Sequence, residues 1–438
     1  MTTIAVGAPV SRHPTAQRVL DAAVSAIETG GEEAIQVEPL VRDLGLTVTA
    51  IYRWFGSRQG LVQAAQQERF HRLSQVGLDE WAAALGMCAS PVDIARLVDS
   101  VLERAFDAEI THLRRRRANA LGSAFGRPEL MAYMGGSIRQ QVDEFARSLE
   151  TAARREALEL KEDPRSLALW YTIAILSRVC FELDPAPPSV TAWNEVCRRG
   201  LHIATLGTAP STPMKRLGAP PVTTWSEPDL PLIPDHPTPQ VLVSLAIEMI
   251  DQHGEDGVKV EPLSRAAGLN VTTIYHWFGN RQGLIDVAQA VRFRRRTADR
   301  LLAFEVAARR VTSRTEAASL IQLSQLSDMT DDDLLGQVQR LNSLGAAYAR
   351  PTLASAIGTL HHRDRRHLAG IFRQLQVPGY ITPDLDLEAF SSWLLGLLIG
   401  QALLVFDGRP EVIAGVRQVQ RRVALSMLFG VGSLGAVG

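Results

Sequence analysis

The sequence predicts an all-α protein built from two similar units. Apolar residues recur at spacings of three and four along almost all of the 438 residues, and the alternation typical of strands is essentially absent. The chain also repeats itself, because the segment beginning at Val37 returns at Val260, 223 residues later. A period of this length is too long for a solenoid unit, so the repeat indicates a duplicated protein.

Each copy opens with a predicted group of three helices. In the first copy Pro14 is a start signal and Gly30-Gly31 is the stop. A second, short helix is expected to begin at Pro39, since the missing donor of proline costs nothing in a first turn. Gly45 then breaks the chain and a third helix follows at once. The same signals recur 223 residues later.

Longer helices follow in each copy, and Pro128 and Pro351 are expected to open two of them. The last two helices of each copy are the most apolar. Their predicted ranges are 164–183 and 189–206 in the first copy and 386–406 and 410–429 in the second.

These signals divide the chain into five parts. The predicted parts are a three-helix domain at 12–61, a helical domain at 62–207, a linker at 208–236, a second three-helix domain at 237–284 and a second helical domain at 285–438. The linker is rich in proline and lacks periodicity. In polyproline conformation its roughly 30 residues would span about 90 Å, enough to lead from one unit to the next.

Bulk properties favour a cytoplasmic, soluble protein. The formal net charge of −1 gives no general attraction to nucleic acid, so any such binding must come from local basic surface. The three cysteines lack metal-ligand spacing and indicate buried thiols in a reducing compartment. No basic targeting region precedes the chain's first apolar residues, and no uninterrupted apolar run reaches the roughly 18 residues of a membrane helix.

The sequence does not favour an enzyme, a cofactor or a metal site. No set of nucleophile, base and orienting residue recurs, and no glycine-rich phosphate loop is present. The run from His361 to His367 does not place three ligands on one helix face, so a polar surface is expected there. The basic run Arg114–Arg117 is interpreted as solvated or ion-paired. The basic cluster of Arg292 and Arg294–Arg296 is interpreted as a solvated helix face, with added phosphate contacts left open.

The pattern at residues 37–55 has the dimensions of a helix-turn-helix, whose second helix enters the major groove of DNA. At about 100° per residue, the inner side of the second helix carries Val48, Ile51 and Phe55, and the opposite side carries Thr49, Ala50 and Arg53. Thr47 is placed to cap this helix, and Tyr52 lies at the edge of its exposed side.

The segment resembles the DNA-binding domain of the tetracycline-repressor (TetR) family of bacterial transcriptional regulators. The matching residues are Leu40-Val41, Gly45, Tyr52, Phe55, Arg58 and Leu61, and again Leu263-Ser264, Gly268, Tyr275, Phe278, Arg281 and Leu284. Arginine replaces the family's usual lysine at 58 and 281, Trp occupies 54 and 277, and Pro stands at 39 and 262. None of these departures removes a phosphate donor.

The resemblance implies a role for each residue of the two motifs. The implied phosphate contacts are Thr47, Tyr52 and Arg58 in the first copy and Asn270, Tyr275 and Arg281 in the second. The implied base readers are Thr49, Ala50 and Arg53 in the first copy and Thr272, Thr273 and His276 in the second. Trp54 and Trp277 are assigned to the same surface, with a role in the small core left open.

The two sets of base readers are similar but not identical. Arg53 can pair bidentately with guanine, whereas His276 cannot do so in the same way. The expected partner is therefore a double-stranded DNA operator with two similar, unequal half-sites.

The resemblance also implies that the rear helices form a ligand-binding and dimerisation domain in each copy. The expected partner there is a small-molecule effector that the residues do not identify. Candidate ligand-binding residues are Phe106, Phe125 and Trp170 in the first copy and Met329, Tyr348 and Trp393 in the second, with ordinary core roles left open. One or both pockets could be functional.

The fold implied is two TetR-like units joined as a pseudo-twofold, single-chain dimer. Residues 164–206 would pack against 386–429 as a four-helix bundle. The seam would be lined by Ala168, Ile173, Ile175 and Val179 on one side and by Leu394, Leu397, Leu398 and Leu403 on the other. Pairing of these helices between two chains, which would give a homodimer, stays open.

The function implied is a regulator, most simply a repressor, that an effector releases from its operator. Two other classes stay open on sequence alone. One is a DNA-binding architectural protein without an effector, and the other is a protein-interaction scaffold that retained the helix-turn-helix.

Overall fold

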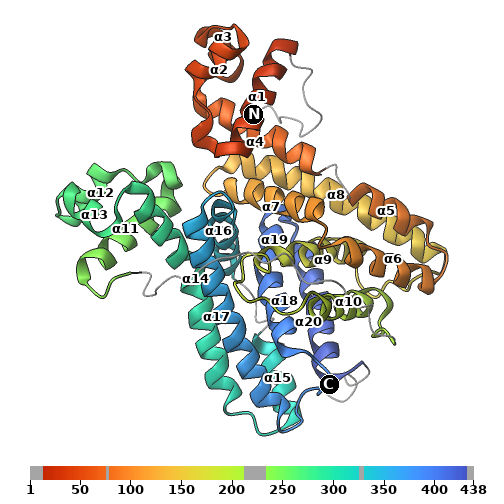
Figure 1. Cartoon of the computed structure of the whole chain (residues 1–438). Coiled ribbons are helices and arrows are strands. Elements are labelled where there is room, and N and C mark those ends of the chain that lie inside the picture. Colours follow the sequence, from red (N-terminus) through yellow and green to blue (C-terminus); the bar gives the residue numbers. More distant parts are fainter. Residues whose placement is uncertain (1–12, 75–77, 212–232, 325–329, 432–438) are drawn as a thin grey trace.

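The structure of the protein is a computed structural model, in which residues 13–74, 78–211, 233–324 and 330–431 are described. Within these ranges every regular element is a helix and no strand occurs, so the predicted all-α class is confirmed. Figure 1 shows two small groups of helices that stand out from a larger helical body.

The helices of the first half follow the predicted order, with two single-turn 3-10 helices labelled η. They are α1 (Pro14–Gly30), η1 (Glu32–Ala34), α2 (Val37–Leu44), α3 (Val48–Phe55), α4 (Arg58–Ser74), α5 (Leu78–Met87), α6 (Pro91–Arg104), α7 (Ala108–Ser123), α8 (Pro128–Arg154), α9 (Pro164–Leu176), η2 (Ser177–Cys180) and α10 (Val190–Leu206).

The helices of the second half repeat this order with some fusions. They are α11 (Pro237–His253), η3 (Glu255–Gly257), α12 (Val260–Ala267), α13 (Val271–Phe278), α14 (Arg281–Ala308), α15 (Arg314–Ser324), α16 (Asp331–Ala347), α17 (Pro351–Gln376), α18 (Leu387–Gly400), α19 (Ala402–Asp407) and α20 (Pro410–Phe429).

Predicted helix limits are wrong in both halves, since α12 begins at Val260 rather than at Pro262 and the helix predicted for 386–406 divides into α18 and α19. The first half shows the same two differences. Helix α2 begins at Val37, so Pro39 lies inside its first turn, where backbone N–H groups have no partner within the helix. The helix predicted for 164–183 ends at Leu176 and continues as η2. There the Ser177 hydroxyl donates to the carbonyl of Ala174 at 2.6 Å, a local bond that bends a helix.

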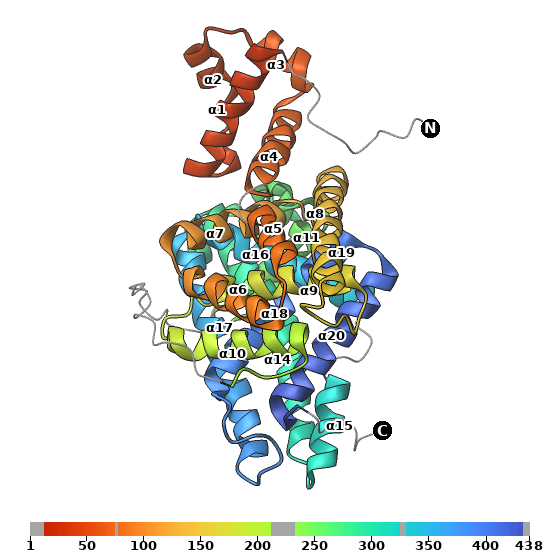
Figure 2. The ribbon, with the colours of Figure 1, turned by 90° about the vertical axis from the view of Figure 1, so that its right-hand side faces the viewer.

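The described residues pack into three separate apolar cores. One, here called head one, draws its buried residues from Val19 to Ala65, and a second, head two, draws them from Leu242 to Ala288. The third core, the body, combines residues of both halves, including all three cysteines as buried free thiols. Figures 1 and 2 show head one standing clear of the body on α4.

The long helix after each motif joins a head to the body. Val62 and Ala65 lie beyond the predicted domain boundary at 61/62 but belong to the core of head one, because α4 runs through that boundary without a break. Farther along the same helix, Phe70 and Leu73 enter the body core. Head and body are therefore linked by a continuous helix. Of the predicted linker 208–236, residues 212–232 lie outside the described residues.

Helices α7 and α16, which start 223 residues apart, cross in direct contact. Asn119 donates its side-chain N–H to the carbonyl of Gly345 at 2.7 Å, and Asn342 donates in the same way to Gly122 at 2.9 Å. A Cβ on Gly122 would lie 2.8 Å from the carbonyl oxygen of Leu341. The two bonds are reciprocal, since each asparagine and each glycine has its equivalent in the other half.

The apolar helices at the end of each half also pack against each other. Trp170 and Trp393, which occupy equivalent positions, meet edge to face with ring centroids 6.5 Å apart. A Cβ on Gly396 would meet the carbonyl of Ser177, so α18 lies against η2 at backbone distance. Of the residues predicted for this seam, Ile175 and Leu398 are half-buried. The others are buried, namely Ala168, Ile173, Val179, Leu394, Leu397 and Leu403.

The run from His361 to His367 is only in part the polar surface that its composition predicts, because Arg363, Arg366 and His367 are exposed while the other members are buried or half-buried. His361 is buried, and Arg365 donates to the Asp184 carboxylate of the first half at 2.8 Å. His362 lies 2.8 Å from the other oxygen of Asp184. The run therefore supplies polar contacts between the halves, and its partners are too distant in sequence to be read from the run itself.

The arginine run of α7 is also more buried than its composition suggests. The Arg114 guanidinium is buried and lies 2.5 Å from Glu182, which Arg115 also contacts at 2.6 Å. The interpretation as ion-paired residues holds for these two.

One segment, Leu387–Asp407, is long and apolar enough to cross a membrane by length and composition. However, 89% of it is buried inside the protein, where it forms α18 and α19 of the shared body. Its apolar character is explained by packing on all sides within this core.

Replacing Gly122 by Ala is expected to lower the free energy of unfolding by about 1–3 kcal/mol, because the new methyl group would meet backbone rather than a movable side chain. The measurement is thermal unfolding. Gly370→Ala in α17 is the matched control, since nothing lies within 4 Å of its added Cβ and a gain of about 0.5–1 kcal/mol is expected. Equal melting temperatures for both variants would contradict the close approach of α7 and α16.

His361 is expected to make stability depend on pH. Burial lowers the pKa of His361 to about 4, against 6.5 in the unfolded chain, although the charge of Asp184 acts in the opposite direction. The native state therefore binds fewer protons between these values, and stability is lost as the pH falls through that window, by up to about 1.4 kcal/mol per pH unit.

The variant His361→Ile tests this, because isoleucine occupies the equivalent position 138 in the first half. Urea unfolding at pH 7.5 and pH 5 should show a smaller loss for the variant than for the natural protein. Parallel losses would show that His361 does not titrate in this way.

Candidate nucleic-acid interface

Each head contains the predicted helix, turn and helix. Gly45 and Gly268 both adopt left-handed backbone conformations with φ of 66°, which only glycine enters without strain. The turn is closed by a bond from the N–H of Leu46 to the carbonyl of Val41 at 2.8 Å, with Leu269 and Ser264 equivalent at 2.9 Å. This geometry fixes the angle at which α3 and α13 leave their heads.

The outer face of α3 is open to solvent as predicted. Ile51 is fully buried against the core of head one, which contributes about 1.5–3 kcal/mol to stability. Thr49 and Arg53 are exposed on the other side, while Ala50 is half-buried. Tyr52 has 42% of its surface exposed, so its hydroxyl is accessible at the edge of this face.

Helix α13 presents the same arrangement with different side chains. Ile274 is fully buried, and Tyr275 is 46% exposed. Thr272 and His276 are exposed, and Thr273 is half-buried like its equivalent Ala50. The two faces therefore share their geometry and differ in donors and acceptors.

The starts of α3 and α13 differ in capping. Thr47 accepts a bond from the N–H of Ala50 at 3.3 Å, as predicted, and is exposed. Asn270 is exposed at the equivalent position but makes no side-chain capping bond. Both helix starts are accessible, and the positive end of a helix dipole attracts anions such as phosphate.

Trp54 and Trp277 are half-buried and packed on the cores of their heads. Trp54 stacks on His13 with centroids 5.9 Å apart, and Trp277 stacks on His236 at 5.2 Å. Each histidine also caps the first helix of its head. The structure thus places both tryptophans between the second helix of the motif and the start of the head. The Arg53 guanidinium carbon lies over the Trp54 ring, 5.8 Å from its centroid.

Arg58 and Arg281 are held inside their own heads. The Arg58 guanidinium donates to the carbonyls of Ile35 and Glu32, both at 2.8 Å, and Arg281 donates to the equivalent Val258 and Glu255 carbonyls at 2.6 Å. These bonds tie the start of α4 or α14 to the short 3-10 helix before the motif. The phosphate role implied for both arginines stays a prediction.

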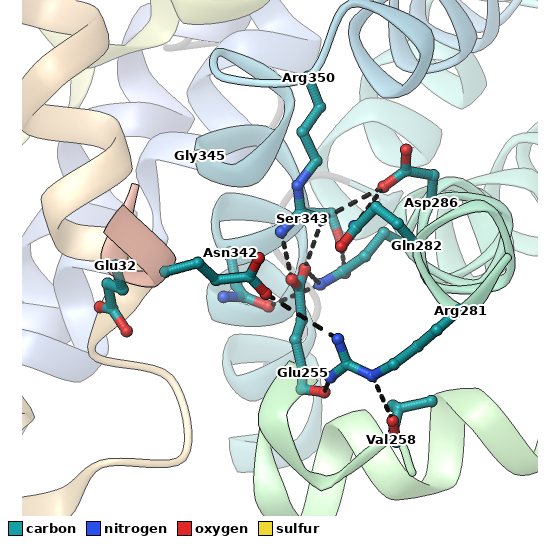
Figure 3. A network of polar contacts seen from close by, with 12 residues as sticks. Glu32, Glu255, Val258, Arg281, Gln282, Asp286, Asn342, Ser343, Gly345 and Arg350 are labelled. Atoms are coloured by element: carbon teal, nitrogen blue, oxygen red, sulfur yellow. Dashed lines mark hydrogen bonds and ion pairs between the residues drawn. The ribbon is translucent and has the colours of Figure 1, made fainter. Parts of the chain in front are cut away.

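A carboxylate clamp joins each head to the body, and sequence reasoning missed it. The Arg127 guanidinium binds both oxygens of Glu32 at 2.6 Å, and Gln66 donates to the same carboxylate at 2.7 Å. In the second half Arg350 and Gln289 hold Glu255 in the same way (Figure 3). The sequence does carry a signal for the clamp, because its three polar residues recur 223 residues later, outside the repeated motif.

A second polar chain runs from each connecting helix to the crossing of α7 and α16. Arg69 donates to the Asn119 oxygen at 2.6 Å, and Asn119 in turn donates to Gly345 of the other half. Arg292 and Asn342 repeat this at 2.9 Å toward Gly122. Burial lowers the pKa of Arg69 to about 10, with Glu32 acting in the opposite direction, so the guanidinium stays charged at neutral pH.

The two heads also approach one another at their inner edges. The Arg281 guanidinium of head two lies 3.9 Å from the Glu33 carboxylate of head one. This pair is largely solvated, so it contributes little to stability. The pair is of interest because it is a direct contact between the two heads.

The candidate ligand-binding residues of the first half lie in three places. Phe106 covers the buried Arg178 guanidinium at 3.7 Å inside the body. Phe125 lies under the Arg292 guanidinium of the second half at 4.4 Å. Trp170 is fully buried in the seam between the halves.

Those of the second half lie mostly at contacts with the first half. Tyr348 donates its hydroxyl to the Val179 carbonyl at 2.8 Å, and Trp393 meets Trp170. Met329 lies outside the described residues. The structure thus places these side chains at separate points of the body, and their ligand role stays a prediction.

Comparison with known proteins supports the assignment of head two. Residues 242–288, which cover most of head two, match the family model described as bacterial regulatory proteins, tetR family. Head two is therefore a DNA-binding helix-turn-helix domain of the TetR type. No curated protein matches the chain significantly.

Among solved structures, the chain is similar to a candidate TetR-family transcriptional regulator from Mesorhizobium loti MAFF303099. The similarity has 15% sequence identity and a TM-score of 0.30, and it covers 36% of this chain and 78% of that chain. A TM-score of this size establishes no shared overall fold.

The clamp predicts that the attachment of each head can be loosened separately. Glu32→Gln removes the charge that Arg127 binds, and the resulting loss from a half-exposed ion pair is about 1 kcal/mol. Amide hydrogen exchange in η1 and α2 should become about fivefold faster, with head two unchanged. Glu255→Gln is the matched control and should affect η3 and α12 only. Equal changes in both heads for either variant would contradict the clamp.

Proposed function

We propose that the protein is a sequence-specific transcriptional regulator of the TetR type in which one chain supplies both DNA-binding heads. The observation that carries this proposal is the paired exposure of Tyr52 and Tyr275, 42% and 46%, on second helices that are otherwise anchored by a buried isoleucine. A phenol hydroxyl exposed at the edge of a second helix can reach the phosphates that flank a major groove and so fix the register of a DNA-binding domain.

The proposed contacts divide by chemistry. Tyr52 and Tyr275 donate hydroxyls to phosphates, and the exposed helix starts at Thr47 and Asn270 add phosphate contacts. Arg58 and Arg281 contribute positive charge beside them. Base reading falls to the outer faces of α3 and α13, formed by Thr49, Ala50 and Arg53 in head one and by Thr272, Thr273 and His276 in head two.

The two heads are proposed to read the two half-sites of one operator as a single-chain pseudo-dimer. Support comes from the reciprocal bonds of Asn119 and Asn342 and from the contact of Trp170 with Trp393. A DNA-binding dimer of this kind reads successive major grooves about 34–36 Å apart. Because the two reading faces differ, the operator is expected to have similar but unequal half-sites.

Regulation is proposed to come from an effector that changes the relative placement of the heads, and repression is its simplest outcome. The clamps at Glu32 and Glu255 support this, since each couples a head to the start of a body helix. An architectural protein would bind the same DNA without responding to any ligand. A scaffold would bind no DNA even at low salt.

Selection from random duplexes tests the function and its asymmetry together. The recovered sites should contain two related half-sites, and Arg53→Ala should relax base preference in one of them at a cost of about 1–3 kcal/mol. His276→Ala should affect the other half-site only.

Tyr52→Phe is the control, because a phosphate contact carries no sequence information. This variant should weaken binding to all duplexes by a similar factor. Two results would contradict the proposal. One is a recovered site with a single half-site. The other is equal affinity for the selected duplex and for two duplexes that each contain one of its half-sites twice.

A further inference from the structure

A pocket of about 510 Å³ opens between head two and the body. Its walls come from α11 of the head, from the connecting helix α14, from α17 of the body and from Ile233, which precedes α11. The three helices would have to stay in place for the pocket to keep its shape. This volume falls within the roughly 300–1,000 Å³ of small-molecule sites. None of the aromatic residues predicted from sequence as ligand contacts lines it.

The pocket combines an apolar floor with a cationic rim. Its floor includes Val243, Ile247 and Leu360, all of them buried. The rim carries three arginines, Arg294 and Arg295 from α14 and Arg363 from α17.

The three rim arginines are poorly neutralised. Arg294 has a long contact of 3.4 Å to Asp364. Arg295 and Arg363 are exposed, and neither forms an ion pair with another residue of the described ranges. Like charges held together over apolar surface favour an anion that brings its own apolar part.

Comparison of the halves shows that this arrangement is specific to the second. Arg72 is the equivalent of Arg295, and it is neutralised by Asp21 and by Glu68, the latter at 2.8 Å. The second half has Ser244 and Val291 at those two positions, both in the pocket wall. Two carboxylates have thus been replaced while the arginine stayed.

The other rim positions change in the same direction. The equivalents of Arg294 and Arg363 in the first half are His71 and Gln140, and the equivalent of Leu360 is Ser137. Every one of these differences makes the second half more cationic at the rim or more apolar at the floor. A merely solvated helix face would not require a more cationic rim and a more apolar floor around the same pocket.

We propose that this pocket binds one amphipathic organic anion, with its apolar part on Val243, Ile247 and Leu360 and its anionic group between Arg295 and Arg363. The site belongs to the second half alone. Because the ligand would touch α11 and α17 together, its binding would fix head two relative to the body. This regulatory consequence rests on the proposed DNA-binding function, whereas the binding site itself does not.

Calorimetric titration of the full chain with octanoate tests the binding site directly. We expect saturable binding of one octanoate per chain, with weaker binding of 1-octanol and of octylammonium, which lack the anionic group. The absence of saturable octanoate binding, or equal binding of the neutral and cationic analogues, would overturn the proposal.

Two double variants test whether octanoate binds in this pocket. The double variant Ser244→Asp/Val291→Glu restores the carboxylates of the first half without removing an arginine, and Arg295→Gln/Arg363→Gln removes the cations. Each should weaken octanoate binding about tenfold, through the loss of two partly solvated ion pairs. Arg366→Gln, an exposed arginine of the same helix α17, is the matched control and should leave the affinity unchanged. Unchanged affinity in both double variants would place the ligand elsewhere and overturn the proposal.

A final arm separates this site from a DNA contact. In the absence of octanoate, Arg295→Gln/Arg363→Gln should bind DNA as the natural protein does. Weaker DNA binding by this variant would assign the arginines to phosphate contacts and overturn the proposal. The titration needs no DNA, so a failure of the proposed regulator function and a failure of this site give different results.

Discussion

The crossing of α7 and α16 is the constraint on which the rest of the arrangement depends. Gly122 and Gly345 let two helix backbones approach so closely that any side chain there would meet main-chain atoms. The reciprocal bonds from Asn119 and Asn342 then satisfy the carbonyls of the facing helix. Since each half supplies one glycine and one asparagine, neither half completes this contact alone. The apolar helices α9, α10, α18 and α20 belong to the same core, and α18 packs directly on α16.

The crossing is connected to both heads by the same chemistry. Arg69 and Arg292 bind the crossing asparagines from the connecting helices, and Glu32 and Glu255 are held where each head meets the body. Charge-assisted bonds of this kind are directional as well as strong, so they set an orientation and not only an attraction. A ligand bound at the proposed site would therefore work against a defined resting position, and the difference between Asp21 and Ser244 would confine that response to head two.

Sequence patterns predicted the features that are local or repeated. Helix periodicity and turn signals within about twenty residues predicted the turn at Gly45, the buried Ile51 and the open face around Tyr52. Composition predicted the apolar seam. The polar contacts between the halves could not be predicted in this way. His362 and Arg365 belong to a run of polar residues, yet their partner Asp184 is almost half the chain away. Arg58 illustrates the same limit, because the motif indicates its charge but not the carbonyls that it holds.

In our proposal one chain forms a complete regulator with two unequal heads. The stoichiometry of the complex with a selected two-half-site duplex tests this, by light scattering coupled to size-exclusion chromatography at low protein concentration. We expect one chain for each duplex, with both half-sites protected. Two chains on each duplex, each with one head bound, would show that a single chain is not the complete regulator.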